Sequence, residues 1–474
     1  MIKLFYLDGK WVEGSASEEV VNPWNADKLA NIFLASTEQV ELAVASAHRA
    51  FAEAKRETAH ERTQRLARIA ALIGQRRDEF VSVLVAEAGK PVTFAEAEVD
   101  RAQMTFGFAA QLASADEGHG IRMDASAPGA GHFGFVRRFP IGVILGITPF
   151  NFPLNLVAHK VAPCLASGNT MVLKPALKTP LSSLLLAEVL HEAGVPAGQV
   201  NVVPFGHEHI PGLLADSRIK MLSFTGSAEV GWKLKAAAVK MKVALELGGN
   251  AAVVVEPDAN WEVAIPKIAL GAFGYAGQSC ISVQRVYVHS SVYSAFRERF
   301  VSYVQEKVKT GDPADRSTII GPMISSAARD KVVKWIREAQ ASGATILADI
   351  ETLSGSLLGP VIVENAPRDA AVLRAEAFAP LVVLESYDSF ADALAMVNDS
   401  SFGLQAGVFT SDLNKAFQAF AMLEVGGVMI NQVPTFRVEN MPYGGVKESG
   451  FGREGVAYAM EEMTEPRSLV IGLS

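Results

Sequence analysis

Short β-rich runs alternate with helical runs through the middle of the chain, and this alternation constrains the fold more than any other feature. The β-rich runs cover residues 143–147, 170–173, 200–203, 220–224, 243–247 and 251–255. A helical run over 181–193 is closed by Gly194 and Pro196, residue types that are common at helix ends. Strands that alternate with helices of this length predict a parallel, doubly wound sheet, so we expect an α/β fold.

The segments on either side of this region predict further elements. Residues 5–12 predict a β-hairpin, and Ser36 followed by Gln39 predicts the capping box of a helix. Helices are also expected over 61–75, 77–88 and 95–113, a second α/β region over 261–431, and a last strand over 467–473. A chain of 474 residues is too long for one hydrophobic core, so we expect two or three domains.

Charge and cysteine content exclude several classes of partner. The net charge of -8 argues against nucleic acid, because phosphate binding needs a basic surface. No apolar run approaches the roughly 20 residues that span a bilayer, so no membrane partner is expected. The two cysteines, Cys164 and Cys280, cannot form a disulfide framework and indicate a reducing compartment, so we expect a cytoplasmic protein.

Two motifs 34 residues apart place a carboxylate and a thiol where covalent catalysis would need them. The motifs are Leu245-Glu246-Leu247-Gly248-Gly249-Asn250 and Gly277-Gln278-Ser279-Cys280. A thiol nucleophile with a carboxylate that accepts a proton suffices for chemistry on a carbonyl group. Taken alone, Cys280 is more often a buried core thiol and Glu246 a solvated charge at a strand end. Cys164, inside an apolar helix, is expected in the core.

Further motifs follow the predicted strands, where ligands gather in a parallel sheet. They are Thr148-Pro149-Phe150-Asn151-Phe152-Pro153, Leu173-Lys174-Pro175, Phe224-Thr225-Gly226-Ser227, Glu376-Ala377-Phe378-Ala379-Pro380 and Pro442-Tyr443-Gly444-Gly445-Val446-Lys447. Together and in this order, these motifs closely resemble those of the aldehyde dehydrogenase superfamily, over essentially the whole chain. Any one motif is weak, but their occurrence together, in order and with matching spacing, is specific.

The resemblance implies a role for each catalytic position. Cys280 would attack the aldehyde carbon to form a thiohemiacetal, and the side chain of Asn151 with the backbone N–H of Cys280 would stabilise the oxyanion. Hydride would then pass to a nicotinamide ring, and Glu246 would activate the water that hydrolyses the thioester. Lys174 would contact the cofactor ribose and relay protons. Glu454 matches a relay carboxylate, although a plain salt bridge is an equal alternative.

The resemblance also implies an NAD or NADP site. Its cofactor-binding positions would be Thr148, Pro149, Phe150, Lys174, Lys178, Gly206, Phe224, Gly226, Ser227, Leu247, Glu376 and Phe378. NAD-preferring members commonly carry a glutamate three residues after the lysine, where this chain has Leu177 followed by Lys178. Because no carboxylate repels a 2′-phosphate there, we expect NADP to be tolerated or preferred. Ala379 replaces the usual glycine after Phe378, a small departure that affects packing of the nicotinamide ring.

Four residues are expected at the substrate. Phe152 and Tyr275 would line an apolar entrance, while Arg101 and Arg437 would meet an anionic or hydroxylated aldehyde. The resemblance leans toward small polar aldehydes, lactaldehyde-like or phosphorylated and phosphonate types. For Arg101, a local pair with Glu98 is an equal alternative.

The resemblance further implies a division of the chain. A Rossmann-like cofactor domain would comprise 1–115 and 138–248, an α/β catalytic domain 249–450, and a small protruding β oligomerisation arm 116–137 and 451–474. Because exposed strand edges find partners, we expect a homodimer or homotetramer. An acylating enzyme that uses coenzyme A is the nearest alternative, but it usually lacks the counterpart of Glu246. A catalytically silent member would have lost Cys280 or Asn151, and a thiol hydrolase would not need Lys174 or Glu376.

Two other patterns are not expected to bind ligands. Residues 129–134 spell G-x-G-x-x-G, but a dinucleotide fingerprint needs a strand before it and a helix after it, and neither is predicted. His207 and His209 have the wrong spacing for two ligands on one helix face, so no metal is predicted.

Overall fold

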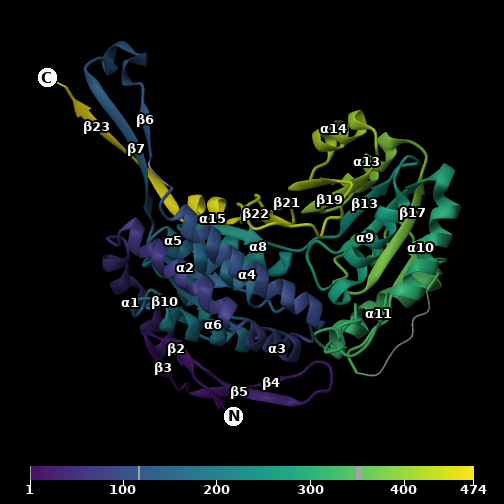
Figure 1. The fold of residues 1–474 in the computed structure, drawn as a ribbon, viewed down its shortest axis with the longest axis horizontal. Helices are drawn as coiled ribbons and strands as arrows, with labels where there is room; N and C mark the ends of the chain where they lie inside the picture. The colour runs from purple at the N-terminus through teal and green to yellow at the C-terminus, as the bar shows by residue number, and fades with distance from the viewer. Residues whose placement is uncertain (1, 116–117, 349–354, 474) are drawn as a thin grey trace.

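The computed structural model describes residues 2–115, 118–348 and 355–473. Two α/β lobes lie side by side, and a slender arm projects from the first lobe (Figure 1). No helix among the described residues is long and apolar enough to cross a membrane.

The first lobe is built on an eight-stranded sheet with the order β22-β12-β11-β8-β9-β10-β2-β3. Its strands are β2 (Phe5–Leu7), β3 (Lys10–Val12), β8 (Val143–Ile147), β9 (Thr170–Lys174), β10 (Val200–Val202), β11 (Ile219–Thr225), β12 (Lys242–Glu246) and β22 (Gly450–Phe451). The five central strands are parallel, whereas the β2–β3 hairpin and β22 join antiparallel at the edges. The predicted doubly wound sheet is confirmed.

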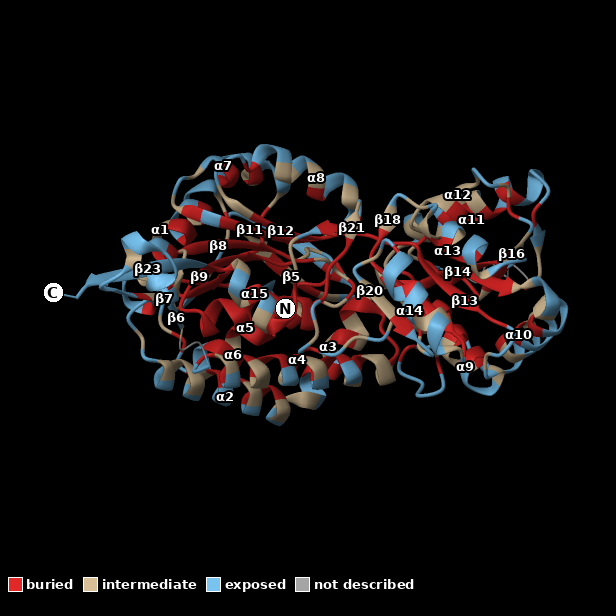
Figure 2. Cartoon of the chain, turned by 90° about the horizontal axis from the view of Figure 1, so that it is seen from above, coloured by how far each residue is buried: buried red, intermediate tan, exposed pale blue. Residues whose placement is uncertain are grey.

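Helices cover both faces of this sheet, and the strands between them are buried (Figure 2). They are α1 (Thr37–Ala54), α2 (Ala59–Gln75), α3 (Arg77–Ala88), α4 (Val92–Leu112), α5 (Asn155–Ala166), α6 (Leu181–Glu192), α7 (Ile210–Ala215), α8 (Ala228–Ala237) and α15 (Val456–Glu462). Helix α1 begins at the predicted capping box, because the Ser36 side chain accepts from the Gln39 N–H and the Gln39 side chain accepts from the Ser36 N–H. Cys164 is buried in α5, as expected.

The second lobe is built on a seven-stranded sheet with the order β15-β16-β17-β14-β13-β19-β20. Its strands are β13 (Ala251–Val255), β14 (Val283–His289), β15 (Thr345–Ile346), β16 (Val361–Glu364), β17 (Leu381–Tyr387), β19 (Gln405–Phe409) and β20 (Gly427–Ile430). Its helices are α9 (Trp261–Phe273), α10 (Tyr293–Lys307), α11 (Ser326–Ala341), α12 (Ala371–Arg374), α13 (Phe390–Asn398) and α14 (Leu413–Met422). All neighbouring strands pair in parallel except β15, which is antiparallel to β16.

The arm is a three-stranded antiparallel sheet, β23 (Thr464–Gly472), β7 (His132–Pro140) and β6 (His119–Ile121). The G-x-G-x-x-G pattern at residues 129–134 begins before β7 and ends within it, in the arm rather than on the first sheet. Residues 451–463, which we assigned to the arm, instead lie on the first lobe. Phe451 pairs with Leu245 of β12, and α15 packs against α4 and α5 with Val456 and Ala459 buried.

Three strands near the N-terminus were not predicted. They are β1 (Ile2–Lys3), β4 (Ala16–Val21) and β5 (Lys28–Leu34), which form a small sheet of their own. A short ladder of β18 (Phe402–Gly403) and β21 (Val446–Lys447) completes the strands.

Candidate active site

The functional motifs lie at the carboxyl ends of the parallel strands of the first sheet. Thr148 follows β8, Lys174 ends β9, Thr225 ends β11 and Glu246 ends β12. Strands that run in parallel end at one edge, so the topology brings these four side chains to the same side of the sheet.

Cys280 lies in the loop between α9 and β14, after the 3-10 turn Gly274–Gly277. Tyr275 and Ala276 adopt left-handed backbone angles, with φ of 53° and 54°, which costs energy for residues with a side chain. Gly277 needs to be glycine, because a Cβ there would lie 2.1 Å from the carbonyl oxygen of Ala379. The backbone of Tyr275 and Ala276 is therefore strained in the turn that positions Cys280.

The thiol of Cys280 opens onto a cavity of about 220 Å³. Its Sγ lies 2.9 Å from the hydroxyl oxygen of Tyr443, close enough for a hydrogen bond. Burial raises the pKa of the Cys280 thiol to about 12, an effect that the hydrogen bond to Tyr443 opposes. In this arrangement the thiol is neutral at pH 7, and its ionisation needs help from its surroundings.

Asn151 is buried beside the Cys280 loop. Its side-chain amide donates a hydrogen bond of 3.0 Å to the carbonyl oxygen of Gln278, two residues before the thiol. Asn151 and Cys280 line the same cavity. The structure therefore brings together the two residues that sequence reasoning paired for oxyanion stabilisation.

Glu246 is 4% exposed, and neither of its carboxyl oxygens has a hydrogen-bond partner among the described residues. Burial and the nearby carboxylate of Glu454 raise its pKa well above the usual value. Glu454 in turn pairs with Lys160 at 3.0 Å and with Arg437 at 3.4 Å, so its pKa is lowered. The salt-bridge alternative for Glu454 is thus present in the structure.

The four predicted substrate residues, Arg101, Phe152, Tyr275 and Arg437, all line the cavity that holds the thiol. The Phe152 and Tyr275 rings meet edge to face, with centroids 6.0 Å apart. The guanidinium of Arg437 lies 3.7 Å from the centroid of the Tyr443 ring, and its Nε is buried without a partner among the described residues. A buried N–H of this kind is costly to leave unpaired, so it suits an acceptor on a ligand.

The alternative of a local pair between Arg101 and Glu98 is wrong. Glu98 pairs with the buried Lys90, while Arg101 pairs with Glu439, which also contacts His159. Both arginines of the cavity wall are therefore paired with a carboxylate, Arg101 with Glu439 and Arg437 with Glu454.

The predicted cofactor residues lie along the same edge of the first sheet and on the facing loop of the second lobe. After the first strands of this edge come Thr148, Pro149 and Phe150, which follow β8, and Lys174, which ends β9 and precedes the exposed Lys178. Further along the edge, Gly206 follows β10, Phe224 lies in β11, Gly226 and Ser227 precede α8, and Leu247 follows β12. In the second lobe, Glu376 and Phe378 lie between α12 and β17. Phe150 and Phe378 come from the two lobes, and their rings meet edge to face at 5.8 Å.

Several groups in this region fit a nicotinamide dinucleotide. The hydroxyl oxygens of Thr148 and Thr225 are buried without partners among the described residues. Burial lowers the pKa of the Lys174 ammonium, and no ion pair occupies it among the described residues. Glu376 accepts the Gly249 N–H at 3.0 Å, and burial raises its pKa to about 7. The two hydroxyl groups, the ammonium group and the second carboxyl oxygen of Glu376 are donors and acceptors of the kind that ribose hydroxyls and phosphates would use.

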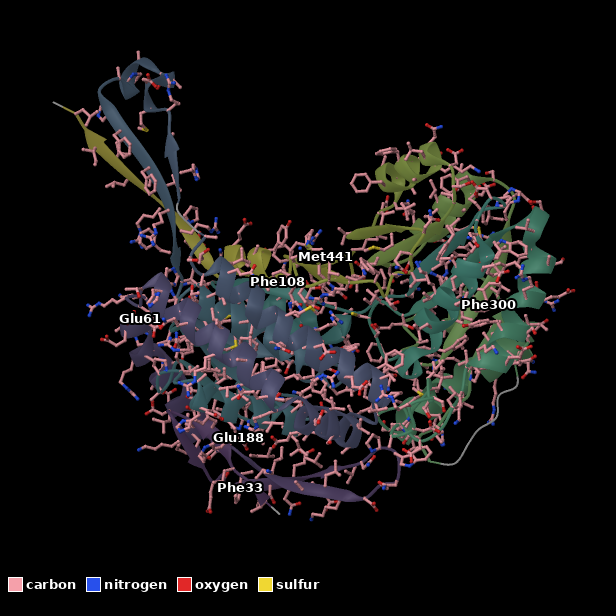
Figure 3. The ribbon with its side chains drawn as sticks, in the orientation of Figure 1. Phe33, Glu61, Phe108, Glu188, Phe300 and Met441 are labelled. Carbon is pink, nitrogen blue, oxygen red and sulfur yellow. The ribbon has the colours of Figure 1, made fainter. Side chains whose placement is uncertain are left out.

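Sequence reasoning missed the charged residues behind the cavity and the role of Tyr443 beside the thiol. Tyr443 stood within a recognised motif, but 163 positions separate it from Cys280. Figure 3 places Met441, two residues before Tyr443, near the junction of the two lobes. His159 and Glu439 are 280 positions apart and gave no signal at all. Among the described residues, no three His, Cys, Asp or Glu side chains are grouped so that they could hold a metal ion.

Comparison with known proteins places these features in a family. Residues 11–469 match the model of the aldehyde dehydrogenase family. The chain is 42% identical over 470 residues to 3-sulfolactaldehyde dehydrogenase of Priestia aryabhattai, covering 99% of this chain and 98% of that one. Two solved structures are similar over nearly their whole length. Aldehyde dehydrogenase 21 of Physcomitrella patens, in complex with the reaction product succinate, has a TM-score of 0.97 at 40% identity, covering 99% of this chain and 98% of that one. Glyceraldehyde-3-phosphate dehydrogenase of Methanocaldococcus jannaschii, complexed with NADP, has a TM-score of 0.92 at 35% identity, covering 97% of this chain and 100% of that one.

Proposed function

The chain belongs to the aldehyde dehydrogenase family, whose members oxidise aldehydes with a nicotinamide cofactor, and from this premise we propose that it oxidises a small anionic aldehyde to the carboxylic acid. One observation carries the proposal: Cys280 and Asn151 share a cavity with Arg101 and Arg437. A nucleophile and an amide donor serve the reacting carbonyl, and two cations serve a charged group on the same small molecule.

In the proposed reaction, Cys280 forms a C–S bond to the aldehyde carbon while the Asn151 amide and the Cys280 N–H bind the developing oxyanion. Losing one such donor typically costs about 3 kcal/mol of transition-state stabilisation. A nicotinamide cofactor, which Lys174 and Glu376 would hold, would supply the acceptor for the hydride that leaves the substrate carbon. Glu246 then takes a proton from the water that hydrolyses the thioester, a task for which its unpartnered carboxyl oxygens leave it free.

An anionic substrate is supported by the two arginines of the cavity. Arg101 and Arg437 lie in its wall, and the Nε of Arg437 is unpartnered. A sulfonate, carboxylate or phosphate near the aldehyde would pair with these groups. Two relatives are named for 3-sulfolactaldehyde and glyceraldehyde-3-phosphate, and a third has the reaction product succinate bound. These compounds are small and anionic, which supports this class.

For the cofactor, we propose that Lys174, Glu376 and the threonines of the strand ends hold NAD(P), with NADP tolerated or preferred. Leu177 is half-buried and Lys178 is exposed beside it. A cation without a neighbouring carboxylate at this turn would accept a 2′-phosphate.

We also propose that the protein works as a homodimer or homotetramer through its arm. Strands β23 and β20 lie at the ends of their sheets, and within the described part of the chain each has one unpaired edge. Leu469, Val470 and Ile471 of β23 are exposed. Exposed apolar edges of this kind are surfaces that a second copy would cover. The unpaired thiols Cys164 and Cys280 favour a reducing compartment such as the cytoplasm.

The function is tested with purified enzyme, both cofactors and a panel of three-carbon and four-carbon aldehydes that carry sulfonate, carboxylate, phosphate or no charge. We expect the anionic aldehydes to give the highest kcat/KM, and Arg101→Gln to lower kcat/KM for them about tenfold or more while sparing the neutral ones. Equal losses for charged and neutral aldehydes would refute the anionic class.

The assignment of Cys280 and Glu246 is tested by transient kinetics. Glu246→Gln should give a burst of about one reduced cofactor per site followed by slow turnover, because thioester forms but is hydrolysed slowly. Cys280→Ala should give neither burst nor turnover. Steady turnover in Cys280→Ala, or acceleration of the wild type by coenzyme A, would contradict this mechanism.

A further inference from the structure

The hydroxyl group of Tyr443 contacts the atom on which the proposed chemistry begins. It lies 2.9 Å from Sγ of Cys280, and the tyrosine side chain is almost completely buried. An antiparallel bridge to Glu454 fixes its backbone, with each residue donating its N–H to the carbonyl oxygen of the other. The phenol is therefore held against the thiol by the fold and does not depend on a ligand to reach it.

This hydrogen bond is not equally strong in the two protonation states of the thiol. Between a neutral thiol and a phenol, either group can donate. Once Sγ is a thiolate, only the phenol can donate, and a hydrogen bond to a charged acceptor is about twice as strong as one between neutral groups. The contact therefore favours the ionised form of Cys280.

The other charged groups around the thiol show why such a donor matters. Burial, Glu376 and Glu246 raise the pKa of Cys280, whereas Tyr443 and Arg437 lower it. Tyr443 is thus one of two groups that offset a strongly unfavourable environment for a thiolate.

The phenol itself stays protonated and is a good donor. Burial and the neighbouring thiol raise the pKa of Tyr443 well above its usual value, so it keeps its proton at neutral pH. The guanidinium of Arg437 lies 3.7 Å from the ring centroid and draws electron density toward itself. A cation on the ring face makes the O–H more polar and strengthens the hydrogen bond that it donates.

We propose that Tyr443 is a catalytic residue that donates a hydrogen bond to Sγ of Cys280 and stabilises the attacking thiolate. The proposal rests on the proposed role of Cys280 as the nucleophile. In the step that it assists, the thiol proton leaves to water, the sulfur lone pair forms the C–S bond, and the C=O π pair moves onto oxygen. Tyr443 keeps its proton throughout, and its hydrogen bond weakens as charge leaves the sulfur.

The test is the rate at which iodoacetamide alkylates Cys280, measured against pH in wild type and Tyr443→Phe. Below its midpoint the rate follows the thiolate fraction, so removing the donor should displace the curve by about one pH unit to higher pH. Because a more basic thiolate is also more nucleophilic, the rate at a given pH should fall about threefold to tenfold. Coincident curves, or a faster variant, would overturn the proposal.

Two further variants separate the hydroxyl from the ring and from the fold. Tyr443→Leu should displace the curve about as far as Tyr443→Phe; if only the leucine variant shifts, ring packing is responsible and the proposal fails. Tyr303→Phe, in helix α10, is the matched control and should behave as wild type. Unchanged cofactor affinity in Tyr443→Phe would verify that the site is intact. The alkylation assay contains no aldehyde and therefore tests only the role of Tyr443. Failure of the proposed function would be seen in a different experiment, as turnover of aldehyde by Cys280→Ala.

Discussion

The pKa values of single side chains in the candidate active site depend on burial as much as on chemical type. Glu376 is a carboxyl group that burial makes about as easy to protonate as a histidine, with a pKa of about 7. Cys280 and Glu246 are shifted in the same direction by the same cause, so the site disfavours charge until a ligand supplies a partner. The pH dependence of ligand binding should therefore reveal which of these groups must be ionised.

For Glu376 we expect cofactor affinity to rise with pH. Its pKa is raised, so the neutral acid prevails below about pH 7 and the carboxylate above it. If ribose hydroxyls donate to the carboxylate, the Kd measured by fluorescence titration should increase up to about tenfold between pH 8 and pH 6. Glu376→Gln should bind more weakly with a Kd that does not change over this range. A variant that keeps the wild-type pH dependence would assign the titration to another group.

For Leu177 we expect a change in cofactor preference. Leu177→Glu places a carboxylate beside Lys178, where it would repel a 2′-phosphate and accept ribose hydroxyls. The ratio of kcat/KM for NADP to that for NAD should fall about tenfold or more, whereas Leu177→Gln, of equal size and no charge, should change the ratio much less. A wild-type enzyme with a large preference for NAD would contradict the underlying expectation.

At the scale of elements, one carboxylate fixes the loop that carries Asn151. Glu98 of α4 accepts the N–H groups of Leu154 and Asn155 at 3.0 Å, at the start of α5, and its other oxygen pairs with the buried Lys90. The ammonium of Lys90 lies 3.8 Å from the centroid of the Phe152 ring. A single residue on α4 thus anchors both the loop of Asn151, the proposed oxyanion donor, and a wall of the cavity.

Glu98→Gln should therefore reduce both stability and catalysis. Removing one partner of a buried ion pair leaves Lys90 uncompensated and costs about 3–5 kcal/mol in the free energy of unfolding, measured by urea denaturation. We also expect kcat to fall more than cofactor affinity, because the loop around Asn151 loosens. The matched control is Glu96→Gln, whose partner Arg316 is exposed, and its free energy of unfolding should change far less than that of Glu98→Gln. Equal effects of the two variants would contradict this role.

The elements that could be predicted from the sequence are those whose own apolar residues show which of their faces are buried. The central parallel strands of the two sheets are buried on both faces and read as continuous apolar runs, so β8 and β12 of the first sheet and β13 of the second are predicted to within about a residue. In contrast, β4 buries only Val20 of its six residues and gives no alternating signal, which is why this strand was missed. Strands that are held by a neighbour rather than by their own apolar face leave little trace in the sequence.

The residues of the candidate active site also differ in whether a local sequence pattern predicts them. Cys280, Glu246 and Asn151 stood in motifs that resemble a family, so their positions were predictable. The partners that set their ionisation come from distant parts of the chain, as with Tyr443 and Glu454. Such pairs are decided by tertiary packing, and no local pattern encodes them.

At the scale of the whole molecule, the arm has little of its own to pack against. Strand β23 is exposed from Glu465 to Gly472, and among the residues that the structure describes it pairs on one side only, with β7. A three-stranded sheet that projects from the lobe (Figure 1) and carries exposed apolar side chains gains little stability from its own contacts. This exposure supports the proposal that another copy of the chain covers the arm.

The last prediction follows from this exposure. Leu469 and Ile471 are 53% and 44% exposed in one chain, and in an oligomer built through the arm they would be buried. Replacing both with Asp should therefore yield a monomer by size-exclusion chromatography with light scattering, because an unpaired buried charge is costly. Val239→Asp, an apolar-to-acidic change at an exposed turn, should keep the wild-type mass.

The cavity around Cys280 is lined within a single chain, so the monomeric variant should keep the wild-type rate of thiol alkylation. A monomeric wild type, or a double variant with the wild-type mass, would place the interface elsewhere, and lost alkylation would mean that assembly shapes the site.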